Sequence, residues 1–191
     1  MLVEVLTPRD PGYPRALLSI SDPPQTLYVR GRLAEADRIA VAVVGSRRAT
    51  PYGVAVAEWL GRELVRSRVT VISGLARGID AAAHRGALQG SGRTIAVLGS
   101  GVDVVYPPEH ARLVEHIVEA GAVLSEYPPG APPLKHQFPK RNRLISGLAL
   151  GVVVVEGRED SGALITADCA LEQGREVFAI PGPVFAQTSV L

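Results

Sequence analysis

The sequence predicts a doubly wound α/β fold with a mostly parallel sheet. Short, continuous apolar runs recur along the chain, the first at residues 39–44, and such runs are typical of strands buried on both faces. Each run is followed by a turn and then by a segment with helical apolar spacing. Strands separated by helices require right-handed crossovers, so these strands are expected to lie parallel.

Strands and helices alternate six times in this pattern. The strands are expected at residues 39–44, 69–72, 94–98, 122–125, 150–155 and 176–179. The helices between them are expected to run to about Arg66, through Ala87, from Pro108 to about Ala120, from Pro139 through Leu148, and from about Ala163 to Gln173. Pro139 suits the first turn of its helix, and Leu144, Ile145 and Leu148 follow at a spacing that buries one face.

The first 36 residues differ from the rest of the chain. Prolines at positions 8, 11, 14, 23 and 24 interrupt any long element and leave a short helix around residues 15–18 and a short strand at 26–29. We interpret residues 1–36 as a proline-rich arm that packs on the core, and residues 37–191 as the α/β domain. One domain with a small appendage suits a chain of 191 residues.

Composition limits the classes of function. The net charge is +1, so a nucleic-acid site must be a local patch. Cys169 is the single cysteine, which excludes an intramolecular disulfide and a cysteine zinc site. His84 follows Asp80 on one expected helix, but no further ligand accompanies the pair, and a core role is expected for this histidine. We recognise no signal peptide and no membrane-spanning run, so we expect a cytoplasmic protein without a membrane partner.

Three strands of the expected sheet end in turns rich in glycine and serine, and such turns expose backbone N–H groups that can hold an anion. The turns are Gly45-Ser46-Arg47-Arg48, Ser73-Gly74-Leu75-Ala76-Arg77-Gly78 and Gly99-Ser100-Gly101. In doubly wound sheets, ligands bind beyond the carboxyl ends of the strands, where these turns lie. The alternative is that each glycine only permits a tight turn and that Arg47 and Arg48 belong to a solvated loop.

The helix that begins near Pro139 has cations in its first turns. Lys140, Arg141 and Arg143 surround Asn142, and no acidic residue lies between Glu126 and Glu156. The helix dipole disfavours cations at this end, so a bound phosphate is the natural compensation, and one positive edge is expected on a neutral molecule. The alternative is a solvated face. The chain lacks both a P-loop and a Gly-x-Gly-x-x-Gly motif, and no nucleophile with a base can be assembled from it.

As a set, these motifs resemble the DNA-processing protein A family (DprA, also called Smf), from about Tyr13 to the C-terminus. The resemblance is carried by Val44-Gly45-Ser46-Arg47, Ser73-Gly74-Leu75-Ala76-Arg77-Gly78-Ile79-Asp80, Gly99-Ser100-Gly101-Val102-Asp103 with Tyr106-Pro107, Ser125-Glu126-Tyr127-Pro128, Phe138-Pro139-Lys140-Arg141-Asn142-Arg143, Ser161-Gly162-Ala163-Leu164-Ile165-Thr166-Ala167, and Gly174 through Gly182.

The resemblance implies an extended Rossmann-like fold that binds single-stranded DNA and helps to load the recombinase RecA during natural transformation. It also implies a homodimer with no enzymatic activity and no cofactor. The DNA site that the resemblance implies consists of Gly45, Ser46, Arg47, Arg77, Lys140, Arg141, Asn142 and Arg143, with Phe138 as a base-stacking residue. We include Arg48 and Gly74, which belong to the same turns.

Two departures and two alternatives accompany this prediction. Many family members have an N-terminal helical domain and a C-terminal winged-helix-like domain, and the family pattern continues where this sequence stops at Ser189-Val190-Leu191, so we expect a truncated domain. One alternative function is a nucleotide-binding enzyme of the related phosphoribohydrolase-like superfamily. Those enzymes carry a Pro-Gly-Gly-x-Gly-Thr loop where this chain has residues 161–166. The other alternative is a protein-interaction scaffold.

Overall fold

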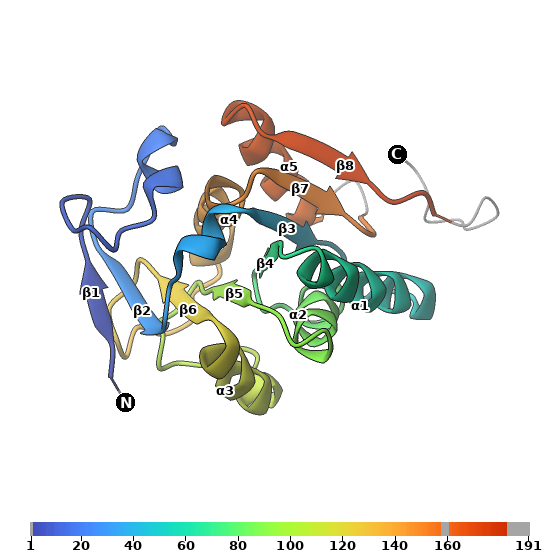
Figure 1. Ribbon diagram of the computed structural model, residues 1–191, viewed down its shortest axis with the longest axis horizontal. Helices are drawn as coiled ribbons and strands as arrows, with labels where there is room; N and C mark the ends of the chain where they lie inside the picture. Colours follow the sequence, from blue (N-terminus) through green and yellow to red (C-terminus); the bar gives the residue numbers. More distant parts are fainter. Residues whose placement is uncertain (1, 158–160, 183–191) are drawn as a thin grey trace.

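The computed structural model describes residues 2–157 and 161–182. Over these residues a single eight-stranded sheet has the strand order β1-β2-β6-β5-β4-β3-β7-β8, with five α-helices around it (Figure 1). The six strands from β3 to β8 are parallel to one another, whereas β2 is antiparallel to both of its neighbours, β6 and β1. The predicted doubly wound, mostly parallel α/β fold is therefore confirmed. The end of the chain at Ser189–Leu191 lies outside the described residues.

The predicted elements of the α/β domain are all present, with ends within about two residues of their expected positions. The strands are β3 (Ala40–Val44), β4 (Thr70–Ser73), β5 (Thr94–Val97), β6 (Ala122–Ser125), β7 (Gly151–Val154) and β8 (Glu176–Ala179), and the helices are α1 (Pro51–Arg66), α2 (Ile79–Gln89), α3 (Ala111–Ala120), α4 (Gln137–Leu148) and α5 (Gly162–Glu172). The predicted start of one helix was wrong. Pro108 opens a 3₁₀ turn, η3 (Pro108–His110), and the α-helix begins after it.

The N-terminal segment contributes strands to the sheet, which goes beyond the expected packing of an arm. It contains β1 (Glu4–Leu6), η1 (Arg15–Ser19), β2 (Leu27–Gly31) and η2 (Glu35–Arg38). β2 pairs with β6, and β1 in turn pairs with β2. The segment therefore covers the β6 side of the parallel sheet with hydrogen-bonded backbone, a connection that the proline-rich sequence did not reveal.

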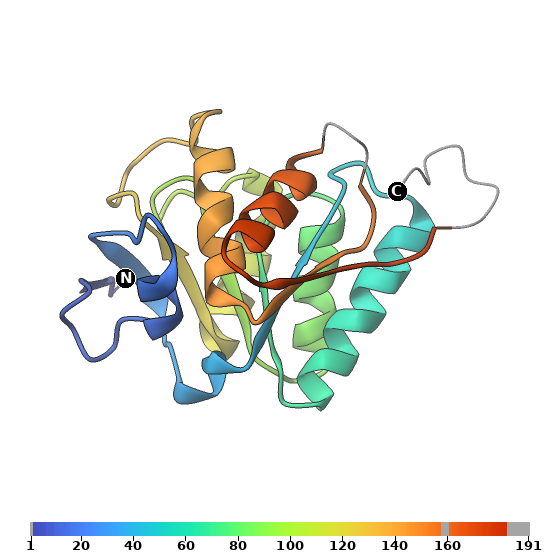
Figure 2. The same ribbon diagram turned by 90° about the horizontal axis from the view of Figure 1, so that it is seen from above.

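Helices cover both faces of the sheet. Figure 1 shows α1, α2 and α3 on one side and α4 and α5 on the other, and in the view from above in Figure 2 η1 lies beside α4. Successive side chains of each strand point to opposite faces of the sheet, so each strand contributes residues to the core on both faces. Ala42 and Val44 of β3 pack with Leu17 and Leu144, whereas Val43 packs with residues of α1 and α2. This double cover explains why the strands are apolar without interruption.

The order of strands reverses between β3 and β7. From β3 the chain builds outward through β4, β5 and β6, and then it returns through α4 to place β7 on the other side of β3. The carboxyl ends of two parallel neighbours whose connections diverge leave a crevice, which is where ligands bind in open α/β sheets. The crevice here lies between the loops that begin at Gly45 and Glu156.

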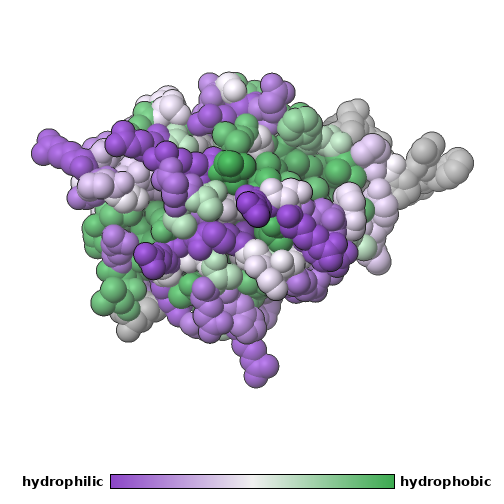
Figure 3. Space-filling model, viewed as in Figure 1, coloured by the Kyte–Doolittle hydropathy of each residue, from purple (hydrophilic) through white to green (hydrophobic). Residues whose placement is uncertain are grey.

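Hydrophobic surface gathers over the β7 and β8 part of the face seen in Figure 3. Leu150, just before β7, and Phe178, in β8, are each 55% exposed. No helix in the described parts of the chain has the length and apolar character that a membrane span requires. The exposed apolar surface lies at the edge of the sheet that β7 and β8 form.

Candidate nucleic-acid interface

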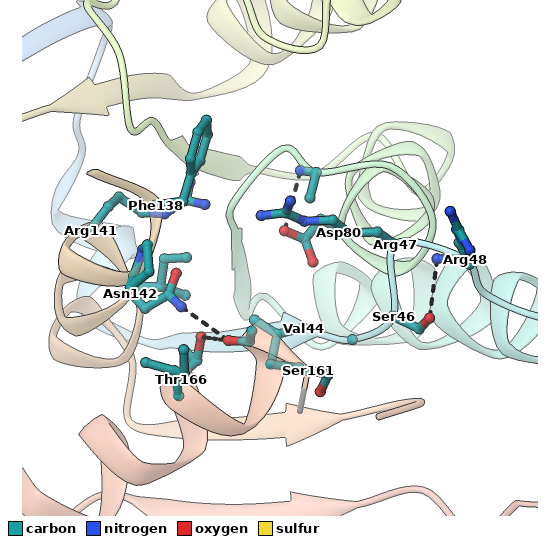
Figure 4. A pocket seen from close by; sticks show the side chains of 17 residues that line it. Val44, Ser46, Arg47, Arg48, Asp80, Phe138, Arg141, Asn142, Ser161 and Thr166 are labelled. Atoms are coloured by element: carbon teal, nitrogen blue, oxygen red, sulfur yellow. Dashed lines mark hydrogen bonds between the residues drawn. The ribbon is translucent and has the colours of Figure 1, made fainter. Parts of the chain in front are cut away.

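A cavity of about 430 Å³ occupies the crevice between β3 and β7 (Figure 4). Four segments line it: the loop after β3, the loop after β4 with the start of α2, the first part of α4 and the first turns of α5. The lining residues are Val44, Gly45, Ser46, Arg47, Arg48, Ala76, Asp80, Phe138, Pro139, Arg141, Asn142, Ile145, Ser161, Gly162, Ala163, Ile165 and Thr166. Two helices thus direct their N-termini, where anions are favoured, toward one hollow.

The loop after β3 is tied to neighbouring loops through its backbone. Ser46 N–H donates to the carbonyl of Glu156 at 2.6 Å, and Arg48 N–H donates to Ser46 Oγ at 3.1 Å. A Cβ at Gly45 would lie 2.8 Å from the same Glu156 carbonyl, so glycine is required for this close approach. The carboxylate of Glu156 accepts from the N–H and the hydroxyl of Thr50, which precedes α1. The loop that presents Arg47 is therefore held at both ends.

The loop after β4 does not present free N–H groups in the way the sequence led us to expect. The carboxylate of Asp80 accepts from Gly74 N–H at 3.1 Å and from Ala76 N–H at 3.3 Å. Leu75 between them has φ of +61° and is fully buried, an uncommon conformation for a leucine. The Asp80 carboxylate thus lies where we expected an external anion, and Gly74 contributes to the conformation of the loop.

Arg141 is buried, with only 3% of its surface exposed. Its Nη1 donates to the carbonyl of Gly74 at 2.8 Å and to the carbonyl of Val97. Burial lowers the pKa of Arg141 to about 10, and the nearby carboxylate of Asp80 opposes this shift. Burial likewise raises the pKa of Asp80, and Arg141 opposes that shift. Arg141 therefore joins α4 to the carboxyl ends of β4 and β5 through hydrogen bonds. Its buried side chain also forms part of the cavity lining.

Asn142 joins the two helices whose N-termini meet at the cavity. Its Nδ2 donates to the carbonyl of Gly162 at 3.0 Å, and the hydroxyl of Thr166 contacts the same oxygen at 3.4 Å (Figure 4). The site that we predicted from the sequence did not include α5. The available signal was that Ser161 and Gly162 stand at the start of the helix that follows β7, a serine and glycine pair of the kind we used for the other turns.

Lys140 and Arg143 lie outside the set of cavity-lining residues. Arg143 pairs with Glu126, and its Nε is 3.2 Å from a carboxylate oxygen of Asp22 in the N-terminal segment. Lys140 Nζ is 3.6 Å from Glu126. The positive charge expected at this edge is therefore partly compensated at these two residues, by Glu126 from the end of β6 and by Asp22. Their contact with DNA stays a prediction.

Arginine and aromatic side chains mark the mouth of the cavity. The guanidinium carbon of Arg47 lies 5.6 Å from the centroid of the Phe138 ring, and that of Arg141 lies 5.9 Å from it. Both distances suit cation–π contact. Arg47 and Arg48 are exposed. Arg77 is also exposed and pairs with Glu109 at 2.5 Å, an interaction that raises the pKa of Arg77 and lowers that of Glu109.

The family model described as DNA recombination-mediator protein A matches residues 4–190. The chain belongs to this family. Among curated relatives, Protein Smf of Escherichia coli is 51% identical over 173 residues, which cover 90% of this chain and 46% of that protein. The chain spans about half the length of this relative and 62% of the DNA processing protein DprA of Streptococcus pneumoniae.

Solved structures of the same family share the fold described above. The crystal structure of DprA from Streptococcus pneumoniae matches with a TM-score of 0.91 and 46% identity, covering 97% of this chain and 65% of that one. DNA processing protein A from Helicobacter pylori, whose structure concerns its single-stranded DNA binding mode, matches with a TM-score of 0.87 and 29% identity, covering 97% and 83%. The family resemblance predicted from the sequence is confirmed.

Proposed function

We propose that this domain binds single-stranded DNA in the cavity between β3 and β7 and acts as a recombination mediator without enzymatic activity. The observation that carries the proposal is the placement of exposed Arg47 at a cavity where the N-termini of α4 and α5 converge. Helix N-termini and arginine both favour phosphate. The DNA-binding mode described for the Helicobacter pylori relative supports the same ligand class.

Contacts with the phosphate backbone dominate in this proposal. The chain has only 3 Phe, 1 Trp and 5 Tyr, so few bases can stack on protein. Binding through phosphate does not depend on base sequence. It weakens as salt rises, because binding releases counterions condensed on the DNA and this release is less favourable at high salt concentration. Arg47, Arg48 and the loop from Gly45 supply this contact, while Arg141 and Asn142 hold the loop and helices in place.

A titration of fluorescent oligonucleotides tests the proposal. Arg47→Ala is expected to weaken binding about tenfold or more for every base sequence, because it removes a charged hydrogen-bond donor to phosphate. Arg66→Ala is the matched control, since Arg66 is exposed at the far end of α1 and changes the net charge equally. Single-stranded DNA should bind more tightly than duplex. Equal affinities of both variants and wild type would refute the site.

Partners follow from family membership. We propose that the DNA-bound protein loads RecA during natural transformation, in the cytoplasm, and that it forms a homodimer. The exposed apolar surface at Leu150 and Phe178 supports pairing with a second copy. Sedimentation of Phe178→Glu against wild type measures the pairing. A wild-type protein that stays monomeric at all concentrations would exclude the dimer.

A nucleotide-processing enzyme is the second candidate. The observation that favours it is the position of the cavity at the strand-order reversal, where related folds hold nucleotide phosphates. Incubation with nucleoside monophosphates, followed by chromatography of the free base, separates the two functions. Release of base that depends on the cavity residues would replace the proposal of a DNA-binding mediator.

A further inference from the structure

A second, smaller hollow continues from the main cavity. It has a volume of about 40 Å³ and is lined in part by Arg77, Tyr106 and Pro107. Arg47 and Phe138 line both hollows. The two therefore form one path across the Phe138 ring, from the crevice between β3 and β7 toward the loop that follows β5.

Tyr106 is the exposed aromatic side chain on this path. It is 42% exposed, whereas Phe138 is only partly accessible and has two guanidinium groups over its ring. The ring centroids of Tyr106 and Phe138 lie 5.6 Å apart, and their planes are tilted by 46°. A base held between two rings needs about 7 Å, which is two stacking contacts of about 3.5 Å. No base fits between these rings, so Tyr106 offers a separate face.

We propose that Tyr106 is a base-stacking residue of the DNA site and that it holds a nucleobase next to the one bound at the main cavity. The inference rests on the proposed binding of single-stranded DNA and adds a second position to it. A stacked base at Tyr106 leaves its phosphate near Arg77 on one side and Arg47 on the other, because both arginines line the same hollow. Stacking on an aromatic ring tolerates any base, which suits a protein without sequence preference.

Stacking at Tyr106 would also give the preference for single strands that the proposed function expects. The bases of a duplex already stack on their neighbours and pair across the helix, so their faces are not available to a protein ring. A surface with phosphate contacts alone would hold duplex as well as single strands. Tyr106 therefore supplies discrimination, while the arginines supply affinity.

Three substitutions of Tyr106 distinguish the contribution of its aromatic ring from those of its hydroxyl group and its apolar volume. Tyr106→Ala is expected to weaken binding of a labelled oligothymidine by about 5- to 150-fold, the range for loss of one stacked base. Tyr106→Phe should bind as wild type, because the ring remains. Tyr106→Leu should behave like Tyr106→Ala, because it keeps apolar volume without an aromatic face. Thermal melting of each variant checks that the fold is intact.

An abasic oligonucleotide of the same length is the second probe. It has the phosphate backbone but no bases, so Tyr106→Ala should bind it as tightly as wild type does. Photocrosslinking with an oligonucleotide that contains a halogenated deoxyuridine should place an adduct on the peptide with Tyr106. Equal binding of oligothymidine by Tyr106→Ala and wild type, or an equal loss with the abasic probe, would overturn the inference alone. Failure of wild type to bind any single strand would overturn the proposed function with it.

Discussion

Asp80 changes the character of the loop after β4. From the sequence, the glycines and serine of this loop indicated a cradle for an external anion, but the anion is a side chain of the protein, bound to Gly74 and Ala76. The pattern of residues in the turn is the same in both cases. What decides between them is the first turn of α2, which brings Asp80 back over the loop that precedes it. Local spacing alone does not carry this information.

His84, one turn further along α2, predicts a dependence of stability on pH. The ring is fully buried, with Nδ1 2.7 Å from Thr94 Oγ1, and burial lowers its pKa from 6.5 to about 3. Between pH 6.5 and about 3 the unfolded chain binds more protons than the folded one, so stability is complete above pH 6.5 and is lost as the pH falls. At about pH 5 the loss from this residue is expected to be about 2 kcal/mol.

Urea unfolding at two pH values measures this loss. Wild type and His84→Gln are compared at about pH 7.5 and about pH 5, so that the contributions of other titrating groups cancel. The variant is expected to be less stable at the higher pH, because the Thr94 contact changes, but to lose less stability on acidification. An identical loss in both proteins would show that His84 does not titrate between the two states as described.

Helix α4 is the element on which the site depends most. Lys140 and Arg141 are neighbours in sequence, yet one meets Glu126 at the surface and the other enters the core. Successive residues of a helix point about 100° apart, so the rotation of α4 decides which cation enters. Burial of Leu144 and Ile145 determines that rotation. The predicted apolar stripe indicated the buried face, but the partner Glu126 lies on another strand end that no local pattern connects to α4.

Substitution of Arg141 tests its role as the tie between α4 and the strand ends. Arg141→Met is expected to lower the free energy of unfolding by about 3–5 kcal/mol, because two buried carbonyls lose their hydrogen-bond donor and the buried Asp80 carboxylate loses a nearby positive charge. Lys140→Met, one residue away, removes an exposed pair and should cost less than about 1 kcal/mol. Urea unfolding of the two variants measures both. Equal effects would place Arg141 at the surface in solution.

The elements themselves were predictable to a large extent. Apolar runs located the parallel strands because both faces of the sheet are covered, which removes the alternation that often blurs strand patterns. The antiparallel pairing of β1 and β2 with the sheet was harder to predict from the sequence. They are short, lie among prolines and owe their pairing to β6, which is almost a hundred residues away. The N-terminus of α5 was identifiable in principle, since Ser161 and Gly162 stand at the start of an expected helix, as serine and glycine do in the turns after β3 and β4.

At the scale of the whole molecule, the N-terminal segment belongs to the main core. Leu17 and Ile20 of this segment pack in the same cluster as Leu144 and Val44, and Arg143 contacts Asp22 across the boundary. Arg93 adds a second link, since it pairs with Asp37 and donates to the carbonyl of Arg32. We therefore expect the segment and the sheet to unfold together in one transition.

Two adjacent leucines make a matched pair for testing this cooperativity. Leu17 is fully buried and Leu18 is 44% exposed. Leu17→Ala is expected to lower the free energy of unfolding by about 2–5 kcal/mol, and Leu18→Ala by much less. Fluorescence of Trp59, the single tryptophan, reports from α1 on the opposite face of the sheet. A Trp59 transition that does not shift in Leu17→Ala would mean that the segment unfolds independently.

Both helices whose N-termini meet at the cavity are attached to the same strand. α4 precedes β7 and α5 follows it, so residues from 138–145 and 161–166, on either side of one strand, supply one side of the cavity. The opposite side comes mainly from the loop after β3. The proposed DNA site is therefore divided between two separate stretches of the sequence. Under this proposal, a chimera that takes the α4 to α5 stretch from a relative would exchange one side of the site as a unit and keep the loop of Arg47 on the other side unchanged.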